Sequence, residues 1–336
     1  MSVFVNDRSA WKATDFANDT SWIGQLNQAE VKEIVAAADR CLAKGMEITD
    51  ITQADFPLPT VAPRIAEWTR EINYGRGFVL VKGIPARKLT KAQVGACFWG
   101  IGTYMGSPVS QNSYGEMLGD VYNEGVKMGT GRVRGYRTNQ HLMFHTDRCD
   151  MVGLLCHRPA KSGGMSSLVS STAIYNEIAK NHPEYLEPLY NGYLHVNVEE
   201  GGDLSTFRVP VYNVHNGVVS CRILRNTIES ARTMGYAKYS QLESDAIAYM
   251  DSLANREDMK IDMMLDAGDM QFINNYTTLH SRTEFEDFED PAEKRHMVRL
   301  WLNAYGKRRD VDWNVFNDYN GVPKTLERKA GVPGIV

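Results

Sequence analysis

Residues 268–282 read GDMQFINNYTTLHSR, and residues 295–302 follow with RHMVRLWL. In the first stretch, the apolar run Asp269–Ile273 is typical of a strand, and the polar turn after it leads to His280. In the second, alternation over His296–Leu302 predicts a strand whose two faces differ. The two strands together predict a β-rich core in the C-terminal half of the chain.

Further strand-like runs lie upstream, and helical patterns separate them. Strands are predicted at residues 77–85 and 151–156, and a hairpin over 209–224 with its turn at Asn216-Gly217. Helices are predicted at residues 27–45, 90–104, 172–180 and 240–253. Strands dominate the C-terminal two thirds of the chain, so we expect an α+β fold around a β-sandwich or barrel.

The chain has 336 residues without a visible linker, internal repeat or low-complexity tract. All-β barrels and sandwiches of this length are often single domains. We expect one domain over 1–336, with a helical N-terminal part at about 1–75, a core at about 76–305 and a C-terminal extension at 306–336. The basic run Lys307–Arg309 in that extension is expected to be a solvated loop.

The sharpest short motif is His145-Thr146-Asp147. Residues i and i+2 of an extended chain point to the same face, so His145 and Asp147 can bind one ion while Thr146 points away. His280 can supply a second imidazole. Two histidines and one carboxylate form the facial triad of non-haem Fe(II) oxygenases, which leaves open positions for a cosubstrate and O₂. A lone HxD pair is common by chance, so the prediction depends equally on His280 and on the arginines that follow it.

Those arginines, Arg295 and Arg299, share one face of the predicted strand with Met297. Inward arginines are costly unless they bind anions, and the guanidinium fork suits carboxylates. Two anions are therefore indicated, namely a dicarboxylate cosubstrate and an anionic substrate. The alternative is an outward face, with both arginines in water or paired with the acidic run at 284–293.

A glycine turn, Ser162-Gly163-Gly164-Met165-Ser166, precedes another apolar strand. The glycines permit a tight turn and a close backbone approach. Ser166 offers a hydroxyl to a carboxylate. Taken alone, the segment is a generic turn.

The order of these motifs resembles the taurine dioxygenase (TauD/TfdA) family of 2-oxoglutarate-dependent oxygenases, including its clavaminate-synthase-like branch. The segments that carry the resemblance are GFVLVKGIP at 77–85, HTD at 145–147, GGMS at 163–166 and the two C-terminal stretches. It covers roughly residues 75 to 305, which is most of the chain.

The resemblance implies a double-stranded β-helix, or jelly roll, that uses Fe(II), 2-oxoglutarate and O₂. By position, His145, Asp147 and His280 match the family's iron ligands, and Arg295 matches the arginine that binds the distal carboxylate of 2-oxoglutarate. Ser166 falls where a threonine assists that arginine in some members. Arg299 matches a position that holds a substrate's anionic group in several members. The implied reaction oxidises a C–H bond by hydroxylation, desaturation or ring closure and releases succinate and CO₂.

Composition narrows the possible partners. A formal charge of −4 gives no reason to expect nucleic acid or an anionic membrane as a partner. The five cysteines are scattered without a CxxC, which favours reduced thiols in a cytoplasmic protein. No secretory segment and no apolar stretch long enough to span a membrane is visible. We expect a small-molecule substrate that is anionic, such as an amino acid or a natural-product intermediate, and a homo-oligomer is compatible with the sequence.

Two rival functions remain at this point. One is a non-catalytic jelly roll that binds a metal without O₂ chemistry, and the other is a zinc hydrolase with the same three ligands. The presence of all three ligands and Arg295 argues against the first. The second gives no reason for two inward arginines.

Overall fold

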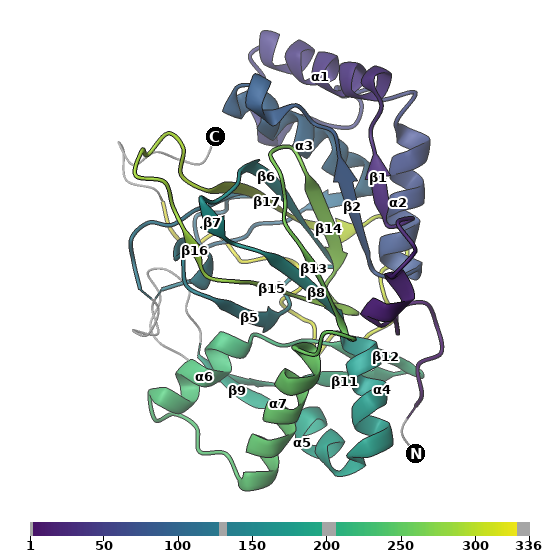
Figure 1. The fold of residues 1–336 in the computed structure, drawn as a ribbon, viewed down its shortest axis with the longest axis vertical. Coiled ribbons are helices and arrows are strands. Elements are labelled where there is room, and N and C mark those ends of the chain that lie inside the picture. The colour runs from purple at the N-terminus through teal and green to yellow at the C-terminus, as the bar shows by residue number, and fades with distance from the viewer. Residues whose placement is uncertain (1–2, 128–132, 197–205, 328–336) are drawn as a thin grey trace.

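The computed structural model describes residues 3–127, 133–196 and 206–327. Its centre is a pair of sheets that face each other, with helices on both outer sides (Figure 1). The expectation of an α+β fold is confirmed. The two sheets matter for function because the predicted site residues lie on strands of both.

The larger sheet has the strand order β1-β2-β14-β6-β17-β3 among the described residues, and β4 also pairs with β17. Its strands are β1 (Ile23–Gln25), β2 (Phe78–Lys82), β3 (Gly106–Pro108), β4 (Leu118–Val121), β6 (Met151–Arg158), β14 (Met270–Asn274) and β17 (His296–Ala304). Strand β1 runs parallel to β2, and the other pairs are antiparallel.

The smaller sheet has the order β13-β8-β15-β5, and every pair is antiparallel. Its strands are β5 (Leu142–His145), β8 (Ser166–Ser170), β13 (Lys260–Met263) and β15 (Thr278–Arg282). Three short pairs lie beside the sheets: β7 (Ser162–Gly163) with β16 (Phe285–Glu286), β9 (Tyr193–Val196) with β10 (Thr206–Val209), and β11 (Tyr212–His215) with β12 (Val218–Cys221).

The helices fall into two groups. The first packs over the outer face of the larger sheet and comprises α1 (Gln28–Ala43), α2 (Ala62–Tyr74) and α3 (Lys91–Met105). The second lies on the outer side of the smaller sheet and comprises α4 (Ser171–Asn181), α5 (Leu186–Asn191), α6 (Arg225–Thr233) and α7 (Gln241–Ala254). Short 3₁₀ turns occur at Ala13–Phe16, Ile48–Asp50, Ala86–Lys88, Gly135–Arg137 and Pro183–Tyr185.

Strand β17 connects two of the cores because its side chains alternate. Val298, Leu300 and Leu302 enter the core under α3, whereas Met297 and Trp301 enter the core between the sheets. A shift of β17 by one residue would move each set of side chains into the wrong core. Burial of both sets therefore fixes the register of the strand. Arg295 and Arg299 are only 7% exposed and line the cavity between the sheets, which excludes the outward alternative.

Local sequence signals explain several elements. Asn27 caps α1 by accepting bonds from the backbone N–H groups of Ala29 and Glu30, and the Glu30 carboxylate accepts a bond from the Asn27 N–H. The hairpin β11–β12 turns at Asn216 and Gly217, whose φ values of 47° and 81° suit a type I′ turn. All four predicted helices are therefore confirmed, with ends one or two residues from those expected, and so is the hairpin, which is three residues shorter at each end than predicted.

The basic run in the C-terminal extension is not a solvated loop. Both oxygens of the buried Asp150 carboxylate accept bonds from Arg308, each at 2.7 Å. Arg309 donates to the Ser220 hydroxyl and to the Val219 carbonyl. Since Asp150 and Val219 belong to the core region, the arginines attach the extension to the sheets, and the expectation of a solvated loop was wrong.

We expect Phe272→Ala to lower the free energy of unfolding by about 3–5 kcal/mol, because it leaves a cavity between α3 and the larger sheet. Phe272 is 0% exposed, and its ring lies 5.6 Å from that of Phe98. Phe288, which is 40% exposed, provides the matched control, and Phe288→Ala should change stability by less than about 0.5 kcal/mol. Urea unfolding of the two variants measures both values, and equal losses would contradict this packing.

Candidate metal centre

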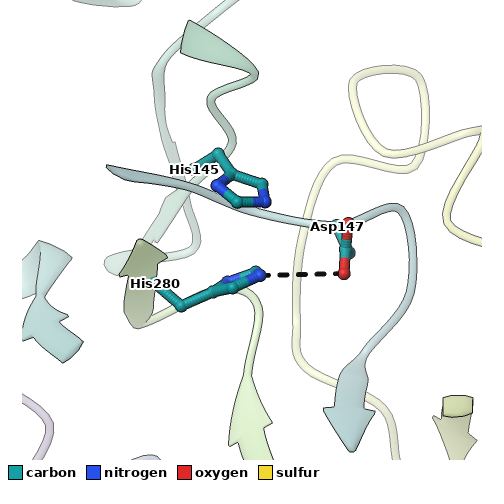
Figure 2. Close-up of side chains that lie close together, drawn as sticks. All are labelled: His145, Asp147 and His280. Carbon is teal, nitrogen blue, oxygen red and sulfur yellow. Dashed lines mark ion pairs between the residues drawn. The ribbon is translucent and has the colours of Figure 1, made fainter. Parts of the chain in front are cut away.

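The smaller sheet brings the three predicted metal ligands together. His145 ends β5 and His280 lies in β15, and the antiparallel register places these two residues directly opposite each other. Asp147 follows two residues after His145, where the chain turns towards β6. Figure 2 shows the two imidazoles and the carboxylate pointing toward one another.

The donor atoms of His145, Asp147 and His280 all lie within 4.8 Å of one another. The His280 Nε2 is 3.8 Å from the Asp147 Oδ2, and the two imidazole centroids are 4.1 Å apart. Among the residues that the structure describes, this is the one group of three or more His, Cys, Asp or Glu side chains close enough to share a metal ion. The two-histidine, one-carboxylate set matches the facial triad, which suits Fe(II) and leaves coordination positions open.

Both histidines are held in the neutral form. Burial lowers the pKa of His280 to about 3, with a further contribution from the neighbouring His145. Burial also lowers the pKa of His145, although Asp147 opposes the shift. The His145 Nδ1 lies 2.8 Å from the Met143 carbonyl oxygen, which can only accept, so Nδ1 carries the proton and Nε2 keeps a free lone pair. Neutral imidazoles are the form that binds a metal.

Asp147 is held in the charged form. Burial opposes ionisation, but the guanidinium of Arg299, with a smaller contribution from Arg134, outweighs it and lowers the pKa of Asp147. The Trp301 indole N–H donates to the Asp147 Oδ2 at 3.0 Å, and the Asp147 backbone N–H donates to the Asn275 side chain. These contacts orient the carboxylate. The chain thus presents one anionic and two neutral donors, which is a set that a divalent cation would complete.

A cavity opens from the triad, and its wall is rich in arginine. Arg295 and Arg299 line it, as the alternation in β17 predicts, and so does Ser166. The sequence analysis did not single out the other arginines of the wall, which are Arg134, Arg148, Arg225 and Arg282. Among the described residues that line the cavity, Asp147 is the single acid, so the wall has a strong excess of positive charge.

Arg295 lines the cavity and contacts Phe285. Its guanidinium carbon is 4.8 Å from the centroid of the Phe285 ring, and its Nη1 is buried without a hydrogen-bond acceptor among the described residues. Burial lowers the pKa of Arg295 to about 10, which leaves it charged at neutral pH. The Ser166 hydroxyl bonds to the Gln271 side chain of the larger sheet, with the Gln271 Nε2 at 3.0 Å.

Arg299 lies next to the triad. Its Nη1 is 3.8 Å from the Asp147 Oδ1, and its Nε donates to the Gln111 side chain at 2.7 Å. Its guanidinium also stacks on Tyr136 and Trp301, at 4.7 and 4.9 Å from the ring centroids. Arg134 stacks on the same two rings and donates to the Gln111 carbonyl. Arg299 is therefore a fixed cation beside a metal ligand.

Among the cavity residues that the sequence analysis missed, Arg282 could have been predicted from strand alternation. It follows His280 by two residues on the same strand, so alternation places it on the same face. Arg134 precedes a 3₁₀ turn in a loop, and no periodicity marks it.

Within the described part of the chain, no helix is long and apolar enough to cross a membrane.

Known proteins resemble this chain over most of its length. Its sequence is 30% identical over 311 residues to FR-33289 synthase of Streptomyces rubellomurinus, a match that covers 91% of this chain and 92% of the relative. It is 24% identical over 329 residues to the taurine hydroxylase-like protein SAT17 of Stachybotrys chartarum, covering 92% and 84%.

Solved structures share the fold. Asparagine oxygenase (AsnO) superposes with a TM-score of 0.66 at 14% identity, covering 85% of this chain and 94% of that one. The non-haem iron oxygenase OrfP, in complex with Fe and alpha-ketoglutaric acid, superposes with a TM-score of 0.61 at 13% identity, covering 84% and 94%.

The family match covers the candidate metal ligands and the strand that carries Arg299. Residues 44–301 match the family described as Taurine catabolism dioxygenase TauD, TfdA family. The matched region contains His145, Asp147 and His280, together with Arg295 and Arg299. The chain belongs to the TauD/TfdA family of Fe(II)- and 2-oxoglutarate-dependent oxygenases.

Proposed function

We propose that this protein oxidises a C–H bond of a small anionic molecule at an iron bound by His145, Asp147 and His280. The observation that carries the proposal is the triad in the wall of an arginine-lined cavity. Bound Fe(II), with 2-oxoglutarate and O₂, would supply the oxidising chemistry, and the cosubstrate would leave as succinate and CO₂. The protein's own contribution is to bind, orient and exclude water.

We also propose that the core is a jelly roll and that residues 1–336 form one domain. Among the described residues the larger sheet has seven strands and the smaller sheet four, and every pair except β1 with β2 is antiparallel. Two facing, largely antiparallel sheets are expected for this architecture. The bonds from Arg308 to Asp150 support a single domain that includes the C-terminal extension.

Arg295 and Arg299 would each bind a different anion. We assign the distal carboxylate of 2-oxoglutarate to Arg295, because its buried Nη1 has no acceptor among the residues that the structure describes and Ser166 can add a hydroxyl. We assign an anionic group of the substrate, such as a carboxylate, to Arg299. The competing explanation for Arg299 is a structural ion pair with a protein acid, and the 3.8 Å approach to Asp147 keeps that alternative open.

Substrate class rests partly on relatives. The structures of asparagine oxygenase and OrfP include complexes with hydroxyasparagine and hydroxyarginine, together with succinate. A small amino acid or a natural-product intermediate with a carboxylate is compatible with the positive cavity wall. A non-catalytic or zinc-loaded jelly roll is not favoured, because neither explains the buried arginine nitrogens without acceptors in the cavity wall.

Removal of a metal ligand should abolish iron binding. We expect Asp147→Ala and His280→Ala to lose Fe(II) at micromolar metal, because each removes both charge and geometry from the triad. His182, whose side chain is 41% exposed, provides the control, and His182→Ala should keep full iron. Metal analysis after anaerobic reconstitution and desalting measures this, and full iron in either ligand variant would refute the assignment.

Removal of Arg295 should weaken cosubstrate binding with iron still bound. Loss of a buried charge-assisted contact predicts a cost of about 2–5 kcal/mol in 2-oxoglutarate affinity for Arg295→Ala. Arg295→Lys should recover only part of it, because an ammonium cannot form the fork. Anaerobic titration of the Fe(II) protein with 2-oxoglutarate gives the affinities. Equal affinity in wild type and Arg295→Ala would assign the carboxylate to another residue.

The function itself is tested by substrate-dependent succinate release across a panel of amino acids and organic acids. With the substrate so identified, we expect Arg299→Ala to fold, to bind Fe(II) and 2-oxoglutarate, and to keep slow uncoupled turnover while it loses substrate oxidation. A lower melting temperature with loss of all ligands would instead support the ion pair with Asp147. Loss of 2-oxoglutarate alone would show that Arg299 contacts the cosubstrate.

A further inference from the structure

We propose that Arg282 is a second binding residue for the distal carboxylate of the cosubstrate, and that it acts as a pair with Arg295. This inference rests on the proposed function, since it assumes that 2-oxoglutarate binds in this cavity. It assigns a ligand to an arginine that neither the sequence motifs nor the metal site requires.

The position of Arg282 is set by β15. It lies two residues beyond His280 on the same face of the strand, roughly 6.7 Å further along at the usual rise per residue. Its cross-strand partner in β8 is Ser166. A short dicarboxylate that chelates the metal beside His280 would therefore direct its far end towards Arg282 and Ser166.

Arg282 and Arg295 flank the same aromatic ring. Each guanidinium carbon lies 4.8 Å from the centroid of Phe285, so the two groups are separated by no more than twice that distance. Both arginines are buried, with 7% of each residue exposed, and both line the cavity. Two buried like charges at this separation repel each other, and a shared anion would relieve the repulsion.

Their hydrogen bonds are incomplete within the protein. The Arg282 Nη2 donates to the Gln140 carbonyl, but its Nε and Nη1 are buried without an acceptor in the described part of the chain. The Nη1 of Arg295 is in the same state. A buried N–H group without an acceptor costs free energy, and charged groups cost most. Three such nitrogens on two arginines that contact the same ring and line the same cavity fit a bound carboxylate, whose two oxygens accept several bonds.

The charges around Arg282 and Arg295 also favour a bound anion. Among the described residues, no carboxylate lies within ion-pair distance of Arg282 or Arg295. The nearest compensation comes from Asp287, which acts electrostatically on both guanidiniums while its Oδ1 accepts the Arg295 backbone N–H at 2.9 Å. One protein carboxylate against two guanidiniums leaves one positive charge, and the distal carboxylate of the ligand would neutralise it.

The test compares two keto acids on the Mn(II)-loaded protein, in which redox turnover is absent. 2-Oxoglutarate and 2-oxobutanoate share the chelating end, but only 2-oxoglutarate has a distal carboxylate. We expect Arg282→Gln to weaken 2-oxoglutarate binding by at least about tenfold and 2-oxobutanoate binding by less than about twofold in calorimetric titrations. Equal affinities for 2-oxoglutarate in wild type and variant would overturn the proposal, and so would equal losses for both ligands.

Arg309→Gln is the matched control, because within the described residues the Arg309 guanidinium hydrogen-bonds only to the Ser220 and Val219 oxygens, and it lies outside the cavity. It should leave both affinities unchanged. If Arg282→Gln does not fold, Arg282→Lys keeps the charge without the fork and should still lose 2-oxoglutarate affinity selectively. An Arg282→Lys protein that binds 2-oxoglutarate as wild type does would refute a paired contact.

A double-mutant cycle with Arg295→Gln identifies the shared ligand. If both arginines hold one carboxylate, their effects on 2-oxoglutarate binding will be non-additive, whereas 2-oxobutanoate will show no coupling. Additive losses would indicate separate sites and contradict the pair. Wild-type protein that binds neither keto acid would instead refute the proposed function, so the two failures are distinguishable.

Discussion

The site depends on the cost of burying the Asp147 carboxylate. At 6% exposure it can remain ionised only because cationic and hydrogen-bonding groups surround it. Arg299 approaches one oxygen at 3.8 Å, and the Trp301 indole N–H bonds the other at 3.0 Å. His145 and His280 stay neutral and contribute lone pairs instead of charge. A divalent cation would complete the arrangement. The need to compensate the buried Asp147 charge therefore accounts both for the groups around the carboxylate and for the candidate metal centre.

The two facing sheets contribute different parts of the site. The smaller sheet supplies the ligands, because the register of β5 and β15 places His145 opposite His280. The larger sheet supplies the surrounding groups through β17, whose inward residues include Arg299 and Trp301. The outward residues of β17 pack under α3, so the helical layer fixes the strand that orients Asp147. Mutations in that layer would therefore reach the metal centre through β17.

Alternation made much of this site predictable from the sequence. It placed His145 with Asp147 and Arg295 with Arg299, because period-two patterns require only local backbone geometry. The same rule applied to His280 would have found Arg282. Arg134 and Gln111 lie in loops, where no period exists, and their approach to Arg299 results from tertiary packing. The solvated-loop prediction for the basic run was wrong because its partner, Asp150, lies far away in sequence. The roles of the individual residues in ligand binding remain predictions.

The most direct test of the central claim is the position of the metal. Crystals of the anaerobic Fe(II) protein with 2-oxoglutarate, measured on both sides of the iron absorption edge, would locate iron independently of any residue assignment. The account predicts one strong anomalous peak within bonding distance of the His145 Nε2, the His280 Nε2 and an Asp147 oxygen, with the keto acid in the open positions. Iron bound elsewhere, or a peak at the triad that contacts only one of these residues, would contradict it.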